Sequence, residues 1–342
     1  MNAIDELRCE NFNATSFFQY YRSNLSSSLQ KAYDLLIGGI INYDNYILIK
    51  DLTIEQLQDI YQKVMLDNPI VFFVESISYQ QTLREHSYKV FPKYRFSKKE
   101  IDATLQAVRA KYEMFIKKNQ NKSALFKEES VHNLLCETVV YDESFAASSF
   151  ECIGPLLFGK GVCEGISKAT KFLLDWLKVK SLVVHGKSLQ RQGNDVLQGE
   201  SHAWNIVSIE KAFYHLDVTF DITVSKFGIV RFDYFNLSDE EIQHDHITSI
   251  KSLPICACSN NYYYSHNLLM YSQDNYKRFL ISQLNCGIKD VVFKIPKSKD
   301  FESAKNKILC ISKACLQNIL ISKYQFQLVY NEYQSVFHLH IF

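Results

Sequence analysis

The first part of the chain alternates between helical and extended hydrophobic patterns. Residues 24–40 carry apolar side chains at helical spacing, and residues 46–49 form a short apolar run typical of a strand. Two further helices are predicted from capping boxes, in which Ser or Thr and a Gln or Glu three residues later satisfy the N–H groups at a helix start. The two boxes are Thr53 with Gln56 and Ser97 with Glu100.

Two extended segments lie between these helices. Residues 71–77 and 88–91 follow the helix-breaking Asp67-Asn68-Pro69 segment and are predicted to pair as strands. The helix from Ser97 is expected to end near residue 118, before a polar stretch at 119–122. We therefore predict an N-terminal accessory α/β region over residues 1–122.

The middle of the chain predicts a helix packed on an antiparallel sheet. Helical spacing occurs in residues 130–141 and again from Cys163 onward, whereas residues 182–185, 203–209 and 213–218 are apolar runs typical of strands. A short turn joins the last two strands, and the polar residues 187–201 are predicted to be a loop beside the substrate entrance. This pattern assigns residues 123–272 to an α+β core.

The C-terminal part has a simpler pattern. Residues 291–295 predict a strand, residues 301–319 a helix, and residues 326–330 with 335–342 a terminal hairpin. We therefore treat residues 273–342 as an appended β-α-β-β unit.

Length, composition and charge limit the class of protein but do not identify its function. The chain has 342 residues, is 47% hydrophobic and carries 38 basic against 37 acidic side chains. It can bury a full core, and its charge balance predicts neither a nucleic acid nor a membrane as partner. The start lacks a basic segment followed by an apolar run, and the nine cysteines are irregularly spaced. We expect a cytoplasmic protein with reduced thiols.

Three segments carry residues suited to nucleophilic catalysis. They are Gly-Val-Cys163-Glu-Gly, Ser-His202-Ala-Trp-Asn and Tyr-His-Leu-Asp217-Val-Thr. A cysteine in the first turn of a helix has its thiolate stabilised by the helix dipole. A histidine can hold that thiolate as an ion pair and later protonate the leaving amine, and a carboxylate fixes the tautomer of the imidazole. Cys163, His202 and Asp217 are therefore predicted to form a catalytic triad.

His202 and Asp217 can contact each other only if the pairing of their two strands places them on the same face of the sheet. If the turn after Ile209 has two residues, Ile209 pairs with Ala212. Asp217 is then a diagonal neighbour of His202 on the same face, about 7 Å away between Cβ atoms. A three-residue loop without a bulge would place Asp217 on the opposite face.

Several other residues are candidates for supporting roles. The backbone N–H of Cys163 and the side chain of Tyr141 are candidate oxyanion donors. Trp204 and Asn205 flank the histidine and are expected to shield the His–Asp pair, orient the ring or pack the sheet. For the substrate, Glu164 is a candidate partner for an amine, and Gly165 permits close approach of a backbone; Glu164 alternatively interacts only with the helix dipole.

The sequence predicts no metal and no cofactor. Cys256-Ala257-Cys258 lies near His244, His246 and His266, but the spacing matches no zinc pattern.

Together the three motifs resemble bacterial members of the transglutaminase-like superfamily, which carry GVCEG, HAWN and YH-x-DVT motifs. The resemblance covers residues 125–246. It implies a cysteine-protease-like (transglutaminase-like) α+β core in which Cys163, His202 and Asp217 occupy the catalytic positions. The chain departs from the pattern at Phe220, where a tryptophan often follows the DVT element. It also lacks the oxyanion glutamine that the papain branch carries ahead of its cysteine.

These features lead to one functional expectation and one rival. The expectation is acyl transfer on a peptide or glutamine-type amide through a thioester at Cys163, with water or an amine as acceptor. Water would make the protein a peptidase or deamidase, and an amine would make it a transglutaminase or amide ligase. The rival is a catalytically silent transglutaminase-like scaffold that binds protein or peptide partners.

Overall fold

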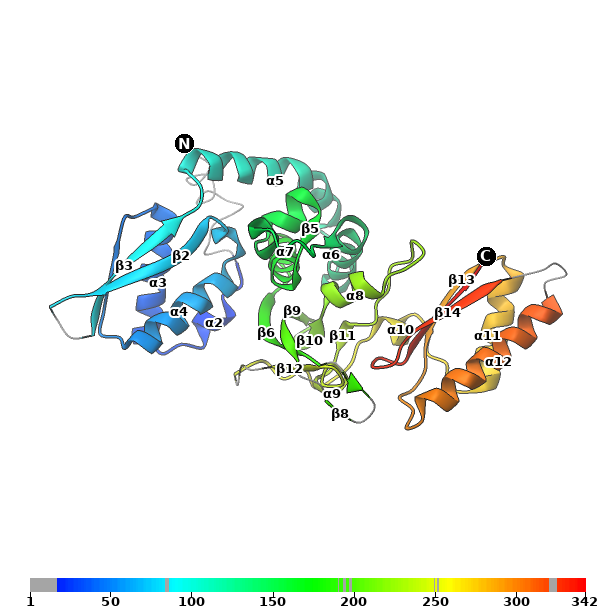
Figure 1. The fold of residues 1–342 in the computed structure, drawn as a ribbon. Helices are drawn as coiled ribbons and strands as arrows, with labels where there is room; N and C mark the ends of the chain where they lie inside the picture. Colours follow the sequence, from blue (N-terminus) through cyan, green and yellow to red (C-terminus); the bar gives the residue numbers. More distant parts are fainter. Residues whose placement is uncertain are drawn as a thin grey trace.

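The computed structural model describes residues 17–83, 86–189, 191–192, 195–196, 199–248, 250, 252–319 and 325–342. The predictions made on the first eight residues lie outside this part of the chain. Three lobes follow one another in the order of the sequence (Figure 1). Each lobe has its own antiparallel sheet, and in the middle lobe the histidine motif lies on this sheet, the aspartate motif where it meets a helix, and the cysteine motif at the start of another helix.

The N-terminal lobe packs helices against a three-stranded sheet of order β1-β3-β2. Both predicted capping boxes are present, at Thr53 and Ser97. The predicted start of the second strand is wrong, because Pro69–Val71 forms a 3-10 turn after the buried Asn68 and β2 begins only at Val74. The elements are α2 (Tyr20–Ser23), α3 (Ser27–Asn42), β1 (Ile47–Lys50), α4 (Ile54–Asp67), β2 (Val74–Gln81), β3 (Ser87–Tyr94) and α5 (Lys98–Asn119).

The middle lobe is a helix-on-sheet core, as the sequence predicts. Its five-stranded sheet has the order β11-β10-β9-β6-β12, and all its neighbours pair antiparallel. The longer elements are α6 (Ala124–Thr138), α7 (Cys163–Trp176), β6 (Ser181–Ser188), β9 (Glu200–Ile209), β10 (Ala212–Leu216) and α8 (Val218–Val224). The shorter ones are β4 (Val140–Tyr141), β5 (Lys160–Gly161), β7 (Arg191–Gln192), β8 (Asp195–Val196), β11 (Phe235–Leu237), α9 (Asp239–Ile242), β12 (His246–Thr248) and α10 (Tyr262–Ser265).

Two predictions in this lobe need correction. Helix α6 begins at Ala124 rather than near residue 130, because Ser123 caps it by accepting from the Phe126 N–H. The segment 187–201 is not only loop. Strand β6 runs on to Ser188, and β9 starts at Glu200, so the two strands pair almost to their tips.

The C-terminal lobe adds a helix to the predicted β-α-β-β pattern. It contains α11 (Gln273–Asn285), β13 (Asp290–Lys294), α12 (Phe301–Ile319), β14 (Phe326–Asn331) and β15 (Val336–Ile341). Its sheet has the order β13-β15-β14. Helix α11 was absent from the prediction although Tyr276, Leu280 and Leu284 form an apolar stripe at helical spacing, and all three are buried.

The hydrophobic cores join two of the lobes and separate the third. One continuous core runs from the N-terminal lobe, with Tyr33 and Ile70, into the middle lobe, with Leu135 and Phe172. The C-terminal lobe has its own core, centred on Phe293 and Phe337. The boundaries at residues 122 and 272 stay predictions, but the first of them crosses a shared core.

Candidate active site

Cys163 is the first residue of α7, so its thiol lies at the positive end of a 14-residue helix. The preceding Val162 is extended and makes no side-chain cap. The N–H groups of the first turn therefore make no hydrogen bond to a side chain at the N-cap. Cys163 is partly exposed, and its thiol is close enough to His202 to help raise the pKa of that ring. The prediction that this cysteine opens a helix is confirmed.

His202 lies on β9 and joins the cysteine to a carboxylate. Its Nε2 is 2.6 Å from Asp217 Oδ2, which leaves Nδ1 to face the thiol. Burial opposes protonation of the ring. The charge of Asp217, its hydrogen bond and the contact with Cys163 outweigh burial and raise the pKa of His202 to about 10.

Asp217 lies at the junction between β10 and α8, where its two carboxylate oxygens have different partners. As the N-cap of α8, it accepts the Phe220 N–H at Oδ1, 3.0 Å away, while Oδ2 faces His202. The side chain is fully buried, and burial alone would raise its pKa. The charge and hydrogen bond of His202, with a contribution from His246, instead hold that pKa well below its usual range.

The hairpin register needed for this contact is confirmed. Ile209 pairs with Ala212 across a two-residue turn at Glu210 and Lys211. Both turn residues have positive φ, 48° and 72°, as a tight hairpin turn with right-handed twist requires. The chain then leaves the sheet at Asp217 on the same side as His202.

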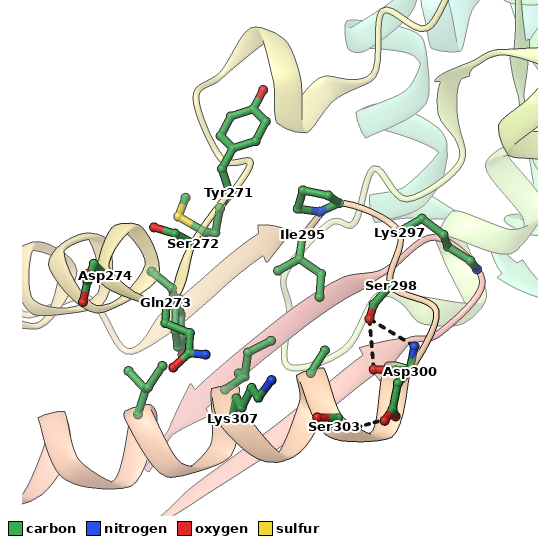
Figure 2. A pocket seen from close by; sticks show the side chains of 16 residues that line it. Tyr271, Ser272, Gln273, Asp274, Ile295, Lys297, Ser298, Asp300, Ser303 and Lys307 are labelled. Atoms are coloured by element: carbon green, nitrogen blue, oxygen red, sulfur yellow. Dashed lines mark hydrogen bonds between the residues drawn. The ribbon is translucent and has the colours of Figure 1, made fainter.

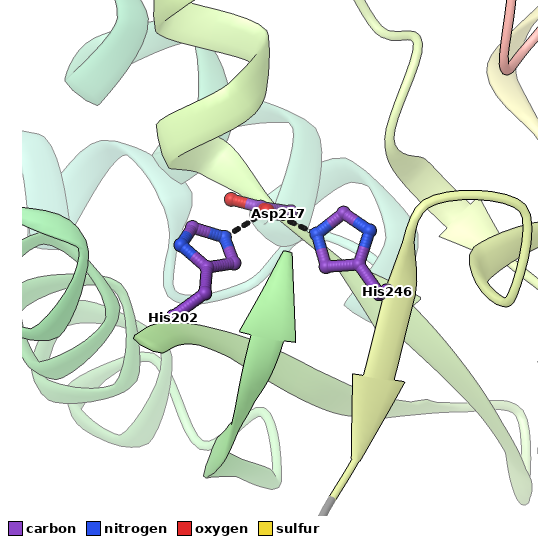
Figure 3. A group of neighbouring side chains, drawn as sticks. All are labelled: His202, Asp217 and His246. Carbon is purple, nitrogen blue, oxygen red and sulfur yellow. Dashed lines mark hydrogen bonds and ion pairs between the residues drawn. The ribbon is translucent and has the colours of Figure 1, made fainter. Parts of the chain in front are cut away.

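His246 is a member of this cluster that sequence reasoning did not assign. Its Nε2 lies 3.0 Å from Asp217 Oδ2, the oxygen that also faces His202 (Figure 3). Its Nδ1 lies 2.7 Å from Asp245 Oδ1, and Asp245 Oδ2 accepts the Tyr234 hydroxyl at 2.5 Å. The sequence contains no local motif for this contact. It depends on the order of the strands, because β12 pairs with the edge of β6 that faces away from β9.

Tyr141 comes close to the nucleophile through a short parallel pairing. Strand β4 pairs with β5, so that Tyr141 lies opposite Gly161, two residues before Cys163. The pKa of Tyr141 is raised by partial burial and by the charges of Cys163 and Glu200. The backbone pairing thus brings Tyr141 into the neighbourhood of Cys163, and its role as an oxyanion donor stays a prediction.

Trp204 and Asn205 take two different places. The Trp204 ring lies nearly parallel to that of His202, with centroids 6.0 Å apart, and its Nε1 donates to His215 Nδ1. The Asn205 amide points to the other side of the sheet and donates to the backbone oxygens of Ser167 and Leu182. Trp204 therefore lines the triad, whereas Asn205 fastens α7 to the sheet and is not an oxyanion donor.

Glu164 and Gly165 were both candidates for substrate contact. Glu164 is paired with Lys168 at 3.0 Å and lies 3.6 Å from the ring of His185. Gly165 needs correction. It is buried, and a Cβ there would lie 2.1 Å from the backbone oxygen of Ser149, so this glycine permits close packing of α7 rather than approach of a substrate.

Three groups of described residues have geometry that could hold a metal ion: His202 with Asp217 and His246, His215 with Asp239 and Cys256, and Asp290 with His338 and His340. The second corrects the expected neighbourhood of the Cys-x-Cys segment, because Cys256 lies beside His215 rather than beside His244 or His266. Within all three groups, each histidine is already hydrogen-bonded to a carboxylate. The predicted absence of a metal stays a prediction.

Two cavities differ in their relation to the triad. A cavity of 780 Å³ lies in the C-terminal lobe between α11, α12 and the segment 295–300, and none of the triad lines it (Figure 2). A second cavity, of 410 Å³, lies between the N-terminal and middle lobes and is lined by Tyr20, Gln62 and His185. Its lining residue His185 lies 3.6 Å from Glu164, the residue after the nucleophile, but none of the triad lines this cavity either.

Comparisons with known proteins give matches only among solved structures. No family model and no curated protein matches the chain. The chain is similar to a protein from Cytophaga hutchinsonii named as a candidate cysteine protease, at 11% identity over 42% of this chain and 61% of that one, with a TM-score of 0.25. It is also similar to a transglutaminase (TGase), at 13% identity over 67% and 65%, with a TM-score of 0.31.

The chain therefore spans less than two thirds of the length of either structure. Within the part of the chain that the structure describes, no helix has the length and apolar character needed to span a bilayer.

Proposed function

We propose that this protein transfers acyl groups from peptide or glutamine-type amides through a thioester on Cys163. The observation that carries the proposal is the contact chain at the start of α7. The thiol lies beside His202 and helps to raise its pKa, and His202 Nε2 lies 2.6 Å from Asp217 Oδ2. Thiol, imidazole and carboxylate in this order are the parts that a cysteine nucleophile needs.

In the first half of the reaction, the Cys163 thiolate attacks the amide carbonyl carbon and forms a C–S bond. The C–N bond then breaks, and His202 gives its Nδ1 proton to the departing amine. Asp217 keeps Nε2 protonated and stabilises the charged ring. The raised pKa of His202 supports this role, because it keeps the ring protonated and able to donate to the departing amine.

The negative oxygen of the tetrahedral intermediate needs donors placed before the reaction begins. The backbone N–H of Cys163, at the uncapped start of α7, is one candidate. The Tyr141 hydroxyl is the second, because β4 carries it to the side of the sulfur.

In the second half, an acceptor attacks the thioester while His202 takes its proton, and the C–S bond breaks. Water yields a carboxylic acid, and an amine yields a new amide. The same thioester serves both acceptors, so substrate tests need both.

The first experiment measures whether Cys163 is an activated thiolate. The intact chain is treated briefly with a limiting thiol alkylator near neutral pH, and labelling at Cys163 and at the other eight cysteines is quantified by peptide mass spectrometry. We expect selective labelling of Cys163, reduced about 100-fold in His202→Ala. His266→Ala is the matched control, because that side chain is 43% exposed and its carboxylate neighbour, Glu129, lies 3.8 Å away and outside the triad.

Turnover is then tested with glutamine peptides, with and without a primary amine, by following ammonia release and amide formation. Loss of both in Cys163→Ala is the result expected of an enzyme. Labelling of Cys163 no faster than at the exposed Cys258 would contradict the proposal and favour the binding-scaffold alternative.

A further inference from the structure

The ring of His246 is held between two carboxylates. Nε2 lies 3.0 Å from Asp217 Oδ2, and Nδ1 lies 2.7 Å from Asp245 Oδ1. A neutral imidazole has one N–H donor and one acceptor nitrogen, whereas an ionised carboxylate only accepts. A neutral ring would therefore direct one lone pair at a carboxylate oxygen. Only the doubly protonated ring donates to both neighbours.

Both carboxylates also accept hydrogen bonds from other groups. Asp217 Oδ1 accepts a backbone N–H, and Oδ2 faces His202 as well as His246. Asp245 Oδ2 accepts the Tyr234 hydroxyl. Both acid side chains are at most 1% exposed, so these contacts replace water around their charges.

The neighbouring His215 provides an internal contrast. Its Nδ1 accepts the Trp204 N–H at 3.0 Å, and its Nε2 lies 2.9 Å from Asp239 Oδ1. One donor and one acceptor around the ring are what a neutral imidazole requires. Burial lowers the pKa of His215, whereas the two carboxylates beside His246 outweigh burial and raise its pKa.

We propose that His246 is a cationic positioning residue of the active site, which shares Asp217 with His202 and so sets the pH at which His202 loses its proton. This inference rests on the proposed acyl-transfer function. The charges alternate along the chain of contacts, from the Cys163 thiolate through His202, Asp217 and His246 to Asp245. The centroids of the two rings that share Asp217 are 5.2 Å apart.

Because two imidazoles share the Asp217 carboxylate, the pKa of His202 changes in a definite direction. A cation at His246 neutralises part of the charge on Asp217 and repels the proton on His202. The pKa of His202 is therefore lower than it would be beside an Asp217 of its own. The thiolate–imidazolium pair is lost as pH rises through that pKa, so removing the second cation extends the reactive window to higher pH.

The groups that face His246 come from several elements. From β9 there are His202 and the Trp204 ring, from β10 His215, and from α8 the Asp217 cap and Phe220. Tyr234 precedes β11, and Asp245 is the neighbour in sequence. Two carboxylates and one hydroxyl thus act on this ring together with two other imidazoles.

The charge of His246 is tested without any assay of activity. Nitrogen-15 NMR of the histidine side chains in the full-length chain distinguishes protonated from bare ring nitrogens. At pH 7 we expect two protonated nitrogens for His246 and one for His215, with the signal of His246 identified by its loss in His246→Gln. One bare nitrogen on His246 at pH 7 would overturn the proposal.

The effect on the site is tested by the pH profile of Cys163 alkylation from pH 5 to 11. His246→Gln retains an N–H donor for Asp217 but has no charge, and Asp245→Asn removes the carboxylate that keeps the ring cationic. In both variants the upper limb of the profile should move about one pH unit higher, with the plateau rate kept within a few fold.

Tyr234→Phe is the matched control, because it removes one hydrogen bond from Asp245 and no charge from the cluster, so its upper limb should stay with the wild type. A fall in the plateau with the limb unmoved in both charge variants would assign His246 a purely structural role. An unreactive Cys163 in the wild type would instead defeat the proposed function, while the NMR result still decides the charge of His246. If one variant fails to fold, the other carries the comparison.

Discussion

At the scale of single residues, the site depends on side chains that perform two tasks at once. Asp217 both caps α8 and faces two imidazoles. The motifs made Cys163, His202 and Asp217 predictable, because their order and strand parity are encoded locally. His246 was not predictable, because 29 residues separate it from Asp217 and only the sheet order β9-β6-β12 brings them together.

Replacing Asp217 with Asn separates its charge from its capping role. Asn is also a good N-cap, so α8 should persist. Without the carboxylate charge, the pKa of His202 falls from about 10 towards its ordinary value, and the thiolate–imidazolium pair is lost at lower pH. We expect alkylation of Cys163 to fall about 10- to 100-fold at pH 8, with the upper limb of its pH profile moved down. An unmoved limb would contradict this account of the triad.

Gly165 can be tested against a glycine in an open place. In Gly165→Ala, the new methyl group would lie 2.1 Å from the Ser149 oxygen, so α7 must shift, at a cost of about 2–3 kcal/mol in the free energy of unfolding. Gly38→Ala in α3 meets nothing within 4 Å and should stabilise by up to about 1 kcal/mol. Urea unfolding of both variants measures the difference, and equal effects would refute the packing role.

At the scale of elements, α7 is the scaffold on which the site is built. Its sequence predicts the helix start at Cys163, but not the contacts that hold it. Ser149 and Asn205 contact α7 from outside the helix, so the local sequence could not show that Gly165 and Asn205 serve the packing of α7. Helix α11 shows the opposite case, since its apolar stripe was readable and its existence needed no tertiary information.

A buried cation fixes the other end of α7. The Lys171 ammonium donates to Asp175 Oδ2 and to the backbone oxygens of Phe18 and Ser181, and it is fully buried. Lys171→Met leaves the carboxyl of Asp175 without its partner and should cost about 3–5 kcal/mol in the free energy of unfolding.

The matched control for this test is Lys117→Met, because Lys117 forms the same type of i,i+4 pair on an exposed helix face. Thermal and urea unfolding should show little change there. A small effect at Lys171 would mean that the buried ion pair adds nothing to the attachment of α7.

At the scale of the whole molecule, the lobes are joined unequally. The N-terminal and middle lobes share one hydrophobic core, while the C-terminal lobe has its own core and is attached to the middle lobe by Val336, which joins the shared core, and by polar contacts. Among these, Asn331 donates to Asp233 and Gln334 donates to the Glu241 backbone oxygen. The sequence patterns predict three regions, but they do not show that the boundary at residue 122 cuts through a shared hydrophobic core.

Truncation distinguishes these two boundaries. A chain of residues 1–272 should unfold cooperatively and retain selective alkylation of Cys163, because its main core is intact apart from a few contacts from the C-terminal lobe. A chain of residues 123–342 loses half of that core and should not fold. Circular dichroism during heating and Cys163 labelling test both, and cooperative unfolding of the shorter middle-to-C-terminal chain would contradict the shared core.

The two-residue turn at Glu210 and Lys211 has a consequence for how this chain can vary in evolution. Each residue added or deleted there moves Asp217 to the opposite face of the sheet, so the length of the turn determines whether Asp217 can contact His202. Sequences descended from the same ancestor can change the composition of this turn freely among residues that tolerate positive φ. A change in its length should survive only together with a compensating bulge or with loss of the catalytic residues.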